Sequence, residues 1–134
     1  MLQEFVKQIC SDLKISDVPT VSPKKTVSFV LNPEVSVFLT ELDPGISMQA
    51  AIAPCPEKKK EDLFMLLMSA NFLGQGTAGS RIGLDRQEKL LTLSLGLPYE
   101  LEYSAFKQHL EDFVNYLVYW RERIAKFEQE ETLI

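Results

Sequence analysis

The chain has 134 residues, of which 46% are hydrophobic and 25% charged, as expected for an ordinary globular protein. Its 14 Lys and Arg residues against 19 Asp and Glu residues give a formal net charge of -5, which argues against nucleic acid as a partner. No secretory leader is recognisable, and no apolar run is long enough to cross a bilayer. We therefore expect one domain over residues 1–134 that stays in the cytoplasm without inserting into a membrane.

The first segment is predicted to form an amphipathic helix, because apolar residues recur at helical spacing. These residues are Leu2, Phe5, Val6, Ile9 and Leu13. Cys10 lies on the same helix as a small hydrophobic residue. Pro19 and Pro23 then predict a loop, since proline lacks the amide donor that a helix needs.

Residues 26–53 predict three antiparallel strands, because apolar runs are split by two turn signals, at residues 32–34 and 43–45. Alternate residues of each strand form an apolar face that we assign to the core. Val30 and Phe38 add apolar area to the opposite face, which should meet water. That opposite face is therefore a candidate contact surface.

A second helix is predicted from about Glu61 to Leu73, and it is apolar on nearly every side. One side carries Leu63, Leu66, Leu67 and Ala70. Most of the rest is covered by Phe64, Met65, Met68 and Phe72. A helix at the edge of a small domain needs only one apolar stripe, so the excess predicts a subunit interface, with burial in a single core as the alternative.

Residues 74–79 match the pattern G-x-G-x-x-G of dinucleotide-binding loops. A dinucleotide site needs a strand before the glycines and a helix after them, whereas here the order is helix, glycines, strand. We therefore predict a plain connection that begins with a helix C-cap at Gly74.

Residues 80–85 and 89–95 predict a β-hairpin, with Ile82 and Leu84 facing the leucines of the second strand. A long final helix is predicted from about Glu102 to Phe127, followed by a frayed end. Its apolar stripe is expected to pack on the sheet rather than to form a coiled coil. The stripe consists of Phe106, Leu110, Phe113, Leu117, Trp120, Ile124 and Phe127.

No set of convergent catalytic side chains is evident. His109 is the single histidine and has no Ser or Cys partner in any motif, so an exposed surface histidine is the simpler interpretation. The carboxylate pairs, such as Glu111 with Asp112, are ordinary solvating charge. Cys10 and Cys55 lie far apart and match no metal-ligand spacing. We expect no enzymatic activity, no metal and no cofactor.

The order of elements resembles that of the class I type III secretion chaperones, a family of small dimeric effector chaperones typified by the Tir chaperone. The similar residues are Leu66 to Leu73, the small-residue link to Gly79, Ile82 to Asp85, and Leu91 to Leu93. Leu97-Pro98 and the aromatic final helix, with Phe113 and Trp120-Arg121, are also similar to the C-terminal third of the family.

The resemblance implies an α+β fold in which a long C-terminal helix packs on a twisted sheet. It implies a cytoplasmic homodimer, or a heterodimer with a related chain, that binds the N-terminal region of a secreted effector. The chaperone would keep that region extended and aid its delivery to the secretion apparatus. Strand addition at a sheet edge suits this task.

We expect effector contacts at two apolar surfaces, the outward side of the first helix and the second sheet face. The residues are Leu2, Val6, Cys10, Val30 and Phe38. Dimer contacts are expected at Phe64, Met65, Met68, Phe72 and Ile82. The main alternative is a structural adaptor subunit of a stable assembly, and a small nucleotide-binding enzyme is the other.

Overall fold

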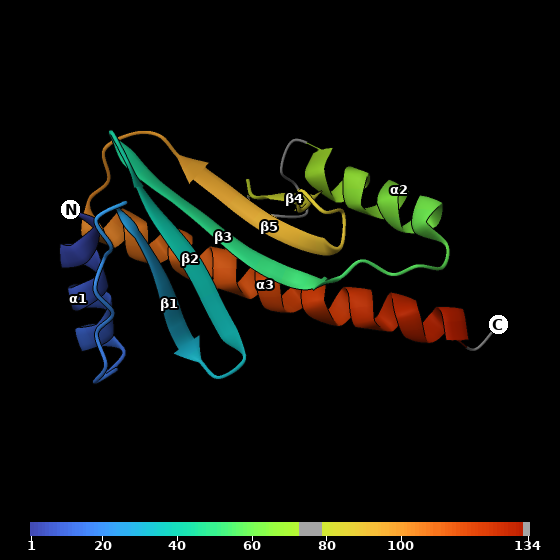
Figure 1. Ribbon diagram of the computed structural model, residues 1–134, viewed down its shortest axis with the longest axis horizontal. Coiled ribbons are helices and arrows are strands. Elements are labelled where there is room, and N and C mark those ends of the chain that lie inside the picture. Colours follow the sequence, from blue (N-terminus) through green and yellow to red (C-terminus); the bar gives the residue numbers. More distant parts are fainter. Residues whose placement is uncertain (73–78, 133–134) are drawn as a thin grey trace. The chain divides into compact units, whose positions relative to one another are not determined.

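The structure is a computed structural model that describes residues 1–72 and 79–132. Its elements in chain order are α1 (Leu2–Asp12), β1 (Thr26–Asn32), β2 (Val35–Leu42), β3 (Gly45–Pro54), α2 (Lys60–Asn71), β4 (Arg81–Leu84), β5 (Leu90–Leu97) and α3 (Tyr103–Thr132). The strands form one sheet in the order β1-β2-β3-β5-β4, so β1 and β4 are the edge strands (Figure 1). The predicted α+β fold, with its long C-terminal helix, is confirmed.

Two helix ends differ from the prediction. α2 ends at Asn71, with Phe72 as an extended C-cap, and the predicted C-cap at Gly74 lies outside the described residues together with most of the glycine motif. α3 does not fray after Phe127 but continues to Thr132. The Glu and Gln residues that follow Phe127 have high helix propensity, so the helix persists after its apolar stripe ends.

The chain divides into two compact units. The first comprises Met1–Gln49 and Gly96–Glu111, and the second comprises Ala50–Leu95 and Asp112–Ile134. β3, β5 and α3 each contribute residues to both units. The single domain over residues 1–134 therefore stays a prediction.

The core of the first unit is built from α1, one face of β1 and β2, and the beginning of α3. In the register of the strand pair, Val27 lies opposite Leu39 and Phe29 lies opposite Val37, and all four are buried. Because side chains alternate along a strand, this register gives the apolar face that the sequence pattern predicts. The ring of Phe5 stacks on that of Phe106 with centroids 5.1 Å apart, which joins α1 to α3.

The prediction that Leu2, Val6 and Cys10 lie on the outward side of α1 is wrong. All three have 0% exposed surface, and they share one buried stripe with Ile9. The reason is helical phase, since residues spaced by four lie on the same face one turn apart. The outward side of α1 is polar instead, with Glu4, Lys7, Gln8, Ser11 and Asp12 exposed. Burial raises the pKa of the Cys10 thiol.

The core of the second unit lies among α2, the β4–β5 hairpin and the later part of α3. Its buried side chains include Leu63, Leu67, Ala70, Ile82, Leu91, Leu93, Phe113, Leu117, Trp120, Ile124 and Phe127. Arg121 donates a hydrogen bond from Nη2 to the carbonyl oxygen of Ala51 at 2.8 Å, which fastens α3 to β3 within this unit. Leu66 was predicted to join this core but is only half-buried.

Gly45, at the turn between β2 and β3, occupies a position that no other residue fits. Its φ is 108°, a conformation that L side chains rarely adopt. A Cβ built there would lie 1.9 Å from the carbonyl oxygen of Leu97. The turn signal at residues 43–45 therefore marks a strand boundary and also allows a close approach of two backbone segments.

Candidate functional site

An exposed apolar pair lies on the outer face of β1 and β2. Val30 is 54% exposed and Phe38 is 45% exposed, as the alternation of the strands predicts. Val30 lies opposite Ser36 and Phe38 lies opposite Ser28, so the two apolar side chains are diagonal neighbours on one face. We call Val30 and Phe38 the outer patch. The hydroxyl oxygens of Ser28 and Ser36 are hydrogen-bonded at 3.1 Å between them.

The backbone of β1 has an open edge beside the outer patch. The N–H of Glu41 donates to the carbonyl oxygen of Lys25 at 2.8 Å, which makes this a hydrogen-bonded pair of the antiparallel ladder. Such pairs alternate, so Ser28 and Val30 fall at the positions whose N–H and C=O point away from β2. Among the described residues, none pairs with these outward groups. An extended segment could therefore add to β1 next to the outer patch.

A second exposed apolar surface lies on α2. Met65, Met68 and Phe72 are 69%, 72% and 65% exposed, and we call these three residues the α2 face. Phe64 is half-buried. Ile82, predicted as a dimer contact, is a buried residue at 7% exposure, because its side chain shares the inner sheet face with the buried Leu93 opposite it.

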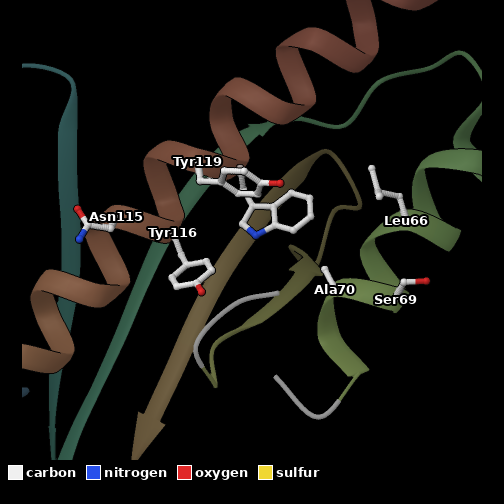
Figure 2. Close-up of a pocket in the computed structure, with 7 residues that line it drawn as sticks. Leu66, Ser69, Ala70, Asn115, Tyr116 and Tyr119 are labelled. Carbon is white, nitrogen blue, oxygen red and sulfur yellow. The ribbon is translucent and has the colours of Figure 1, made fainter. Parts of the chain in front are cut away.

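Two hollows flank the α2 face. The larger has a volume of about 700 Å³ and is lined by Leu66, Ser69 and Ala70 of α2 and by Asn115, Tyr116, Tyr119 and Trp120 of α3. Figure 2 shows the rings of Tyr116 and Tyr119 on one side of this hollow and Leu66, Ser69 and Ala70 on the other. The smaller, of about 240 Å³, is lined by Phe64, Leu67, Met68, Asn71, Ile82, Gly83, Leu84 and Leu91. Both hollows are largely apolar, so they suit apolar side chains of a partner.

The side chain of Asn71 ties α2 to β4. Its Oδ1 accepts a hydrogen bond from the N–H of Ile82 at 2.8 Å, and its Nδ2 donates to the carbonyl oxygen of Ile82 at 2.9 Å. Sequence reasoning did not single out Asn71 for any role. The one available signal was its position as a polar amide in the last turn of a helix that is apolar on nearly every side.

Charged and polar groups hold α1 in place at both ends. Oε1 of Glu41 accepts a hydrogen bond from the N–H of Leu2 at 2.7 Å, and this bond holds the pKa of Glu41 below its usual range. At the other end, the hydroxyl of Tyr103 donates to Asp12, and Lys107 lies 3.3 Å from the same carboxylate. Burial, followed by the bond to Asp12, raises the pKa of Tyr103 to about 12.

Over residues 1–72 and 79–132, no three His, Cys, Asp or Glu side chains come together in a way that could hold a metal ion. His109 is half-buried rather than exposed as predicted, because it lies on α3 next to the buried Leu110. No helix in the described part of the chain combines the length and apolar character needed to span a membrane. The surface features that do stand out are apolar contact areas and an open strand edge.

The outer patch and the α2 face each bring exposed apolar side chains together, and such surfaces are typical of proteins that bind other proteins. The chain belongs to the Tir chaperone protein (CesT) family, whose profile matches residues 4–121. The family resemblance is therefore confirmed, and the protein is a chaperone of type III secretion effectors. The family is one of chaperones and not of enzymes.

Two solved structures show the same fold. The chain is similar to one in the crystal structure of the ExsC–ExsE complex, with a TM-score of 0.73 and 13% identity, covering 90% of this chain and 91% of that chain. It is also similar to one in the structure of the HopA1–SchA chaperone–effector complex, with a TM-score of 0.64 and 16% identity, covering 91% of this chain and 97% of that chain. A comparison with curated proteins found no match.

Proposed function

We propose that the chain binds an extended N-terminal segment of a secreted effector along the open edge of β1 and over the outer patch. The observation that carries this proposal is the presence of exposed Val30 and Phe38 beside the outward backbone groups of the same strand pair. A segment added to β1 would gain main-chain hydrogen bonds and would set alternate side chains over the patch. This binding involves no turnover and no cofactor.

The class of partner follows from the family and from a structural relative. The HopA1–SchA structure is a chaperone–effector complex with the same fold. We infer an effector partner for this chain too, held extended and competent for secretion until it reaches the secretion apparatus. Because a chaperone must meet its client before export, we place its action in the bacterial cytoplasm.

The proposed working unit is a homodimer that forms through the α2 face. A two-fold interface uses the same patch on both subunits, so Met65, Met68 and Phe72 of both subunits would be buried in it. Each large apolar side chain contributes about 1.5–3 kcal/mol when it is fully removed from water. The two hollows beside α2 offer places for side chains of the partner subunit. A heterodimer with a related chain would use the same surface.

The proposal is tested by first capturing the client and then removing the outer patch. Co-purification from the native bacterium, followed by mass spectrometry, identifies the client. Calorimetry then compares binding of its N-terminal segment to the wild-type chain, to Phe38→Ser and to the control Val118→Ser. Val118 is 39% exposed on α3, so the control removes an apolar side chain of similar exposure from another surface.

We expect Phe38→Ser to lower client affinity at least tenfold, which corresponds to about 1.4 kcal/mol, because an apolar contact is lost. The melting temperature should change little, and Val118→Ser should bind as the wild type does. Unchanged affinity of Phe38→Ser would place the client elsewhere. Recovery of a constant set of machinery proteins in place of a secreted client would favour the adaptor alternative.

A further inference from the structure

The sheet has a second edge strand, β4, at the end opposite to β1 in strand order. We propose that Asn71 closes this edge and so directs strand addition to β1, an inference that rests on the proposed function above. An unpaired edge strand is a template for any extended segment or for a second copy of the chain. A protein that binds extended clients at one edge therefore needs a device that keeps them from the other.

The register of β4 shows which of its backbone groups an incoming strand would use. The N–H of Asp85 donates to the carbonyl oxygen of Leu90 at 3.0 Å, so residue 85 is a hydrogen-bonded position of the β4–β5 ladder. Such positions occur at every second residue, so Gly83 and Arg81 are also bonded to β5, and Ile82 and Leu84 fall between them. Their N–H and C=O groups point outward, away from β5.

Asn71 meets both outward groups of Ile82. Its carboxamide has one acceptor oxygen and one donor nitrogen, the same pair of groups that a peptide unit presents. The distances of 2.8 Å and 2.9 Å are those of good hydrogen bonds on both sides. The side chain therefore stands where a residue of a neighbouring strand would stand. Because β4 has only 4 residues, Leu84 is the one other outward position that it offers.

At the edge of β1, Ser22 meets the outward groups of Thr26 in a similar way, because its N–H donates to the carbonyl oxygen of Thr26 at 2.8 Å and its hydroxyl accepts from the N–H of Thr26 at 3.3 Å. The outward groups of Ser28 and Val30, further along this strand of 7 residues, are open. A client strand thus meets two successive open positions on β1, Ser28 and Val30, but a single one on β4, Leu84. The bonds between Asn71 and Ile82 also hinder two copies of the chain from pairing through the backbone of β4.

The test uses the full chain and needs no client. Asn71→Ala removes the carboxamide, and Gln87→Ala is the matched control, because Gln87 has an exposed carboxamide in the same unit and lines neither hollow. We expect the amide of Ile82 in Asn71→Ala to exchange with deuterium about tenfold faster than in the wild type. Light scattering should also show species larger than the wild-type assembly as concentration rises. Gln87→Ala should match the wild type in both measurements.

A second substitution identifies the edge that associates. Leu84→Pro, added to Asn71→Ala, removes the other outward N–H of β4 and should reverse the association. The inference would be overturned if Asn71→Ala had the same rate of amide exchange at Ile82 and the same mass by light scattering as the wild type. So would association that persists in the double variant.

If Asn71→Ala does not fold, Asn71→Asp replaces it and is judged by the same outcomes. It keeps the shape and the acceptor but sets a carboxylate against the carbonyl oxygen of Ile82. The two proposals can fail separately. Loss of the Asn71 effect leaves client binding at β1 standing, and unchanged affinity of Phe38→Ser leaves the closure of β4 standing.

Discussion

A negative charge on the α2 face is expected to split the dimer. Met68 is 72% exposed in the single subunit. Since full burial of methionine contributes about 1.5–3 kcal/mol, covering its exposed part contributes roughly 1–2 kcal/mol per subunit. Two-fold symmetry applies this loss twice, so Met68→Glu should weaken association by roughly 2–4 kcal/mol, or roughly 30- to 1,000-fold in Kd. Desolvation of the two carboxylates adds to the loss.

Light scattering at micromolar concentration measures the effect. The matched control is Leu13→Glu, which places the same charge on a leucine that is 47% exposed at the end of α1. We expect Met68→Glu to be a folded monomer by light scattering and circular dichroism, and Leu13→Glu to remain a dimer. If Met68→Glu stays dimeric at this concentration, the α2 face is not the interface.

Three further predictions concern stability and chemistry. The hydrogen bond from the start of α1 lowers the pKa of Glu41, so its carboxylate stabilises the fold above the unfolded-state pKa of about 4.3, and this contribution is lost as pH falls through the folded-state value. Glu41→Gln should lower the free energy of unfolding in urea by about 1 kcal/mol at pH 7 and by less below pH 4; an equal loss at both pH values would contradict this. Gly45→Ala should lower the free energy of unfolding by about 2 kcal/mol or more in the same assay. Gly83→Ala is the control and should lower it far less, because a Cβ at residue 83 meets nothing within 4 Å. Equal losses would argue against the strained turn. His109→Ala and a chelator should each leave client binding unchanged in calorimetry, and a large loss from either would revive a catalytic or metal role.

Local patterns carried the prediction of the fold and of the outer patch. Alternation along β1 and β2, together with the turn signals between strands, is enough to set Val30 and Phe38 on the face opposite to the core. These features depend on neighbours in sequence, so they can be read without the tertiary structure. The excess apolar surface of α2 was predictable in the same way, because a helix wheel needs no tertiary contacts.

Features that depend on non-local packing could not be predicted in this way. The helical spacing of Leu2, Val6 and Cys10 sets them on one face of α1, but the elements that pack against the helix decide that this face is the buried one. The role of Asn71 depends on β4 being an edge strand and on Ile82 being an outward position of its ladder. Both facts are properties of the assembled sheet, so the spacing of residues in α2 cannot predict them.

Site-specific photo-crosslinking in the native bacterium tests client binding at the β1 edge. A benzoyl-phenylalanine residue replaces Phe38 in one strain and Val118 in another, since both positions are exposed and only the first belongs to the outer patch. After irradiation, the position 38 strain should yield a crosslink to a secreted effector, attached through its N-terminal region, and the position 118 strain should yield none. Crosslinks to the effector from position 118 alone, or crosslinks from position 38 only to constant machinery proteins, would contradict the proposed mode of binding.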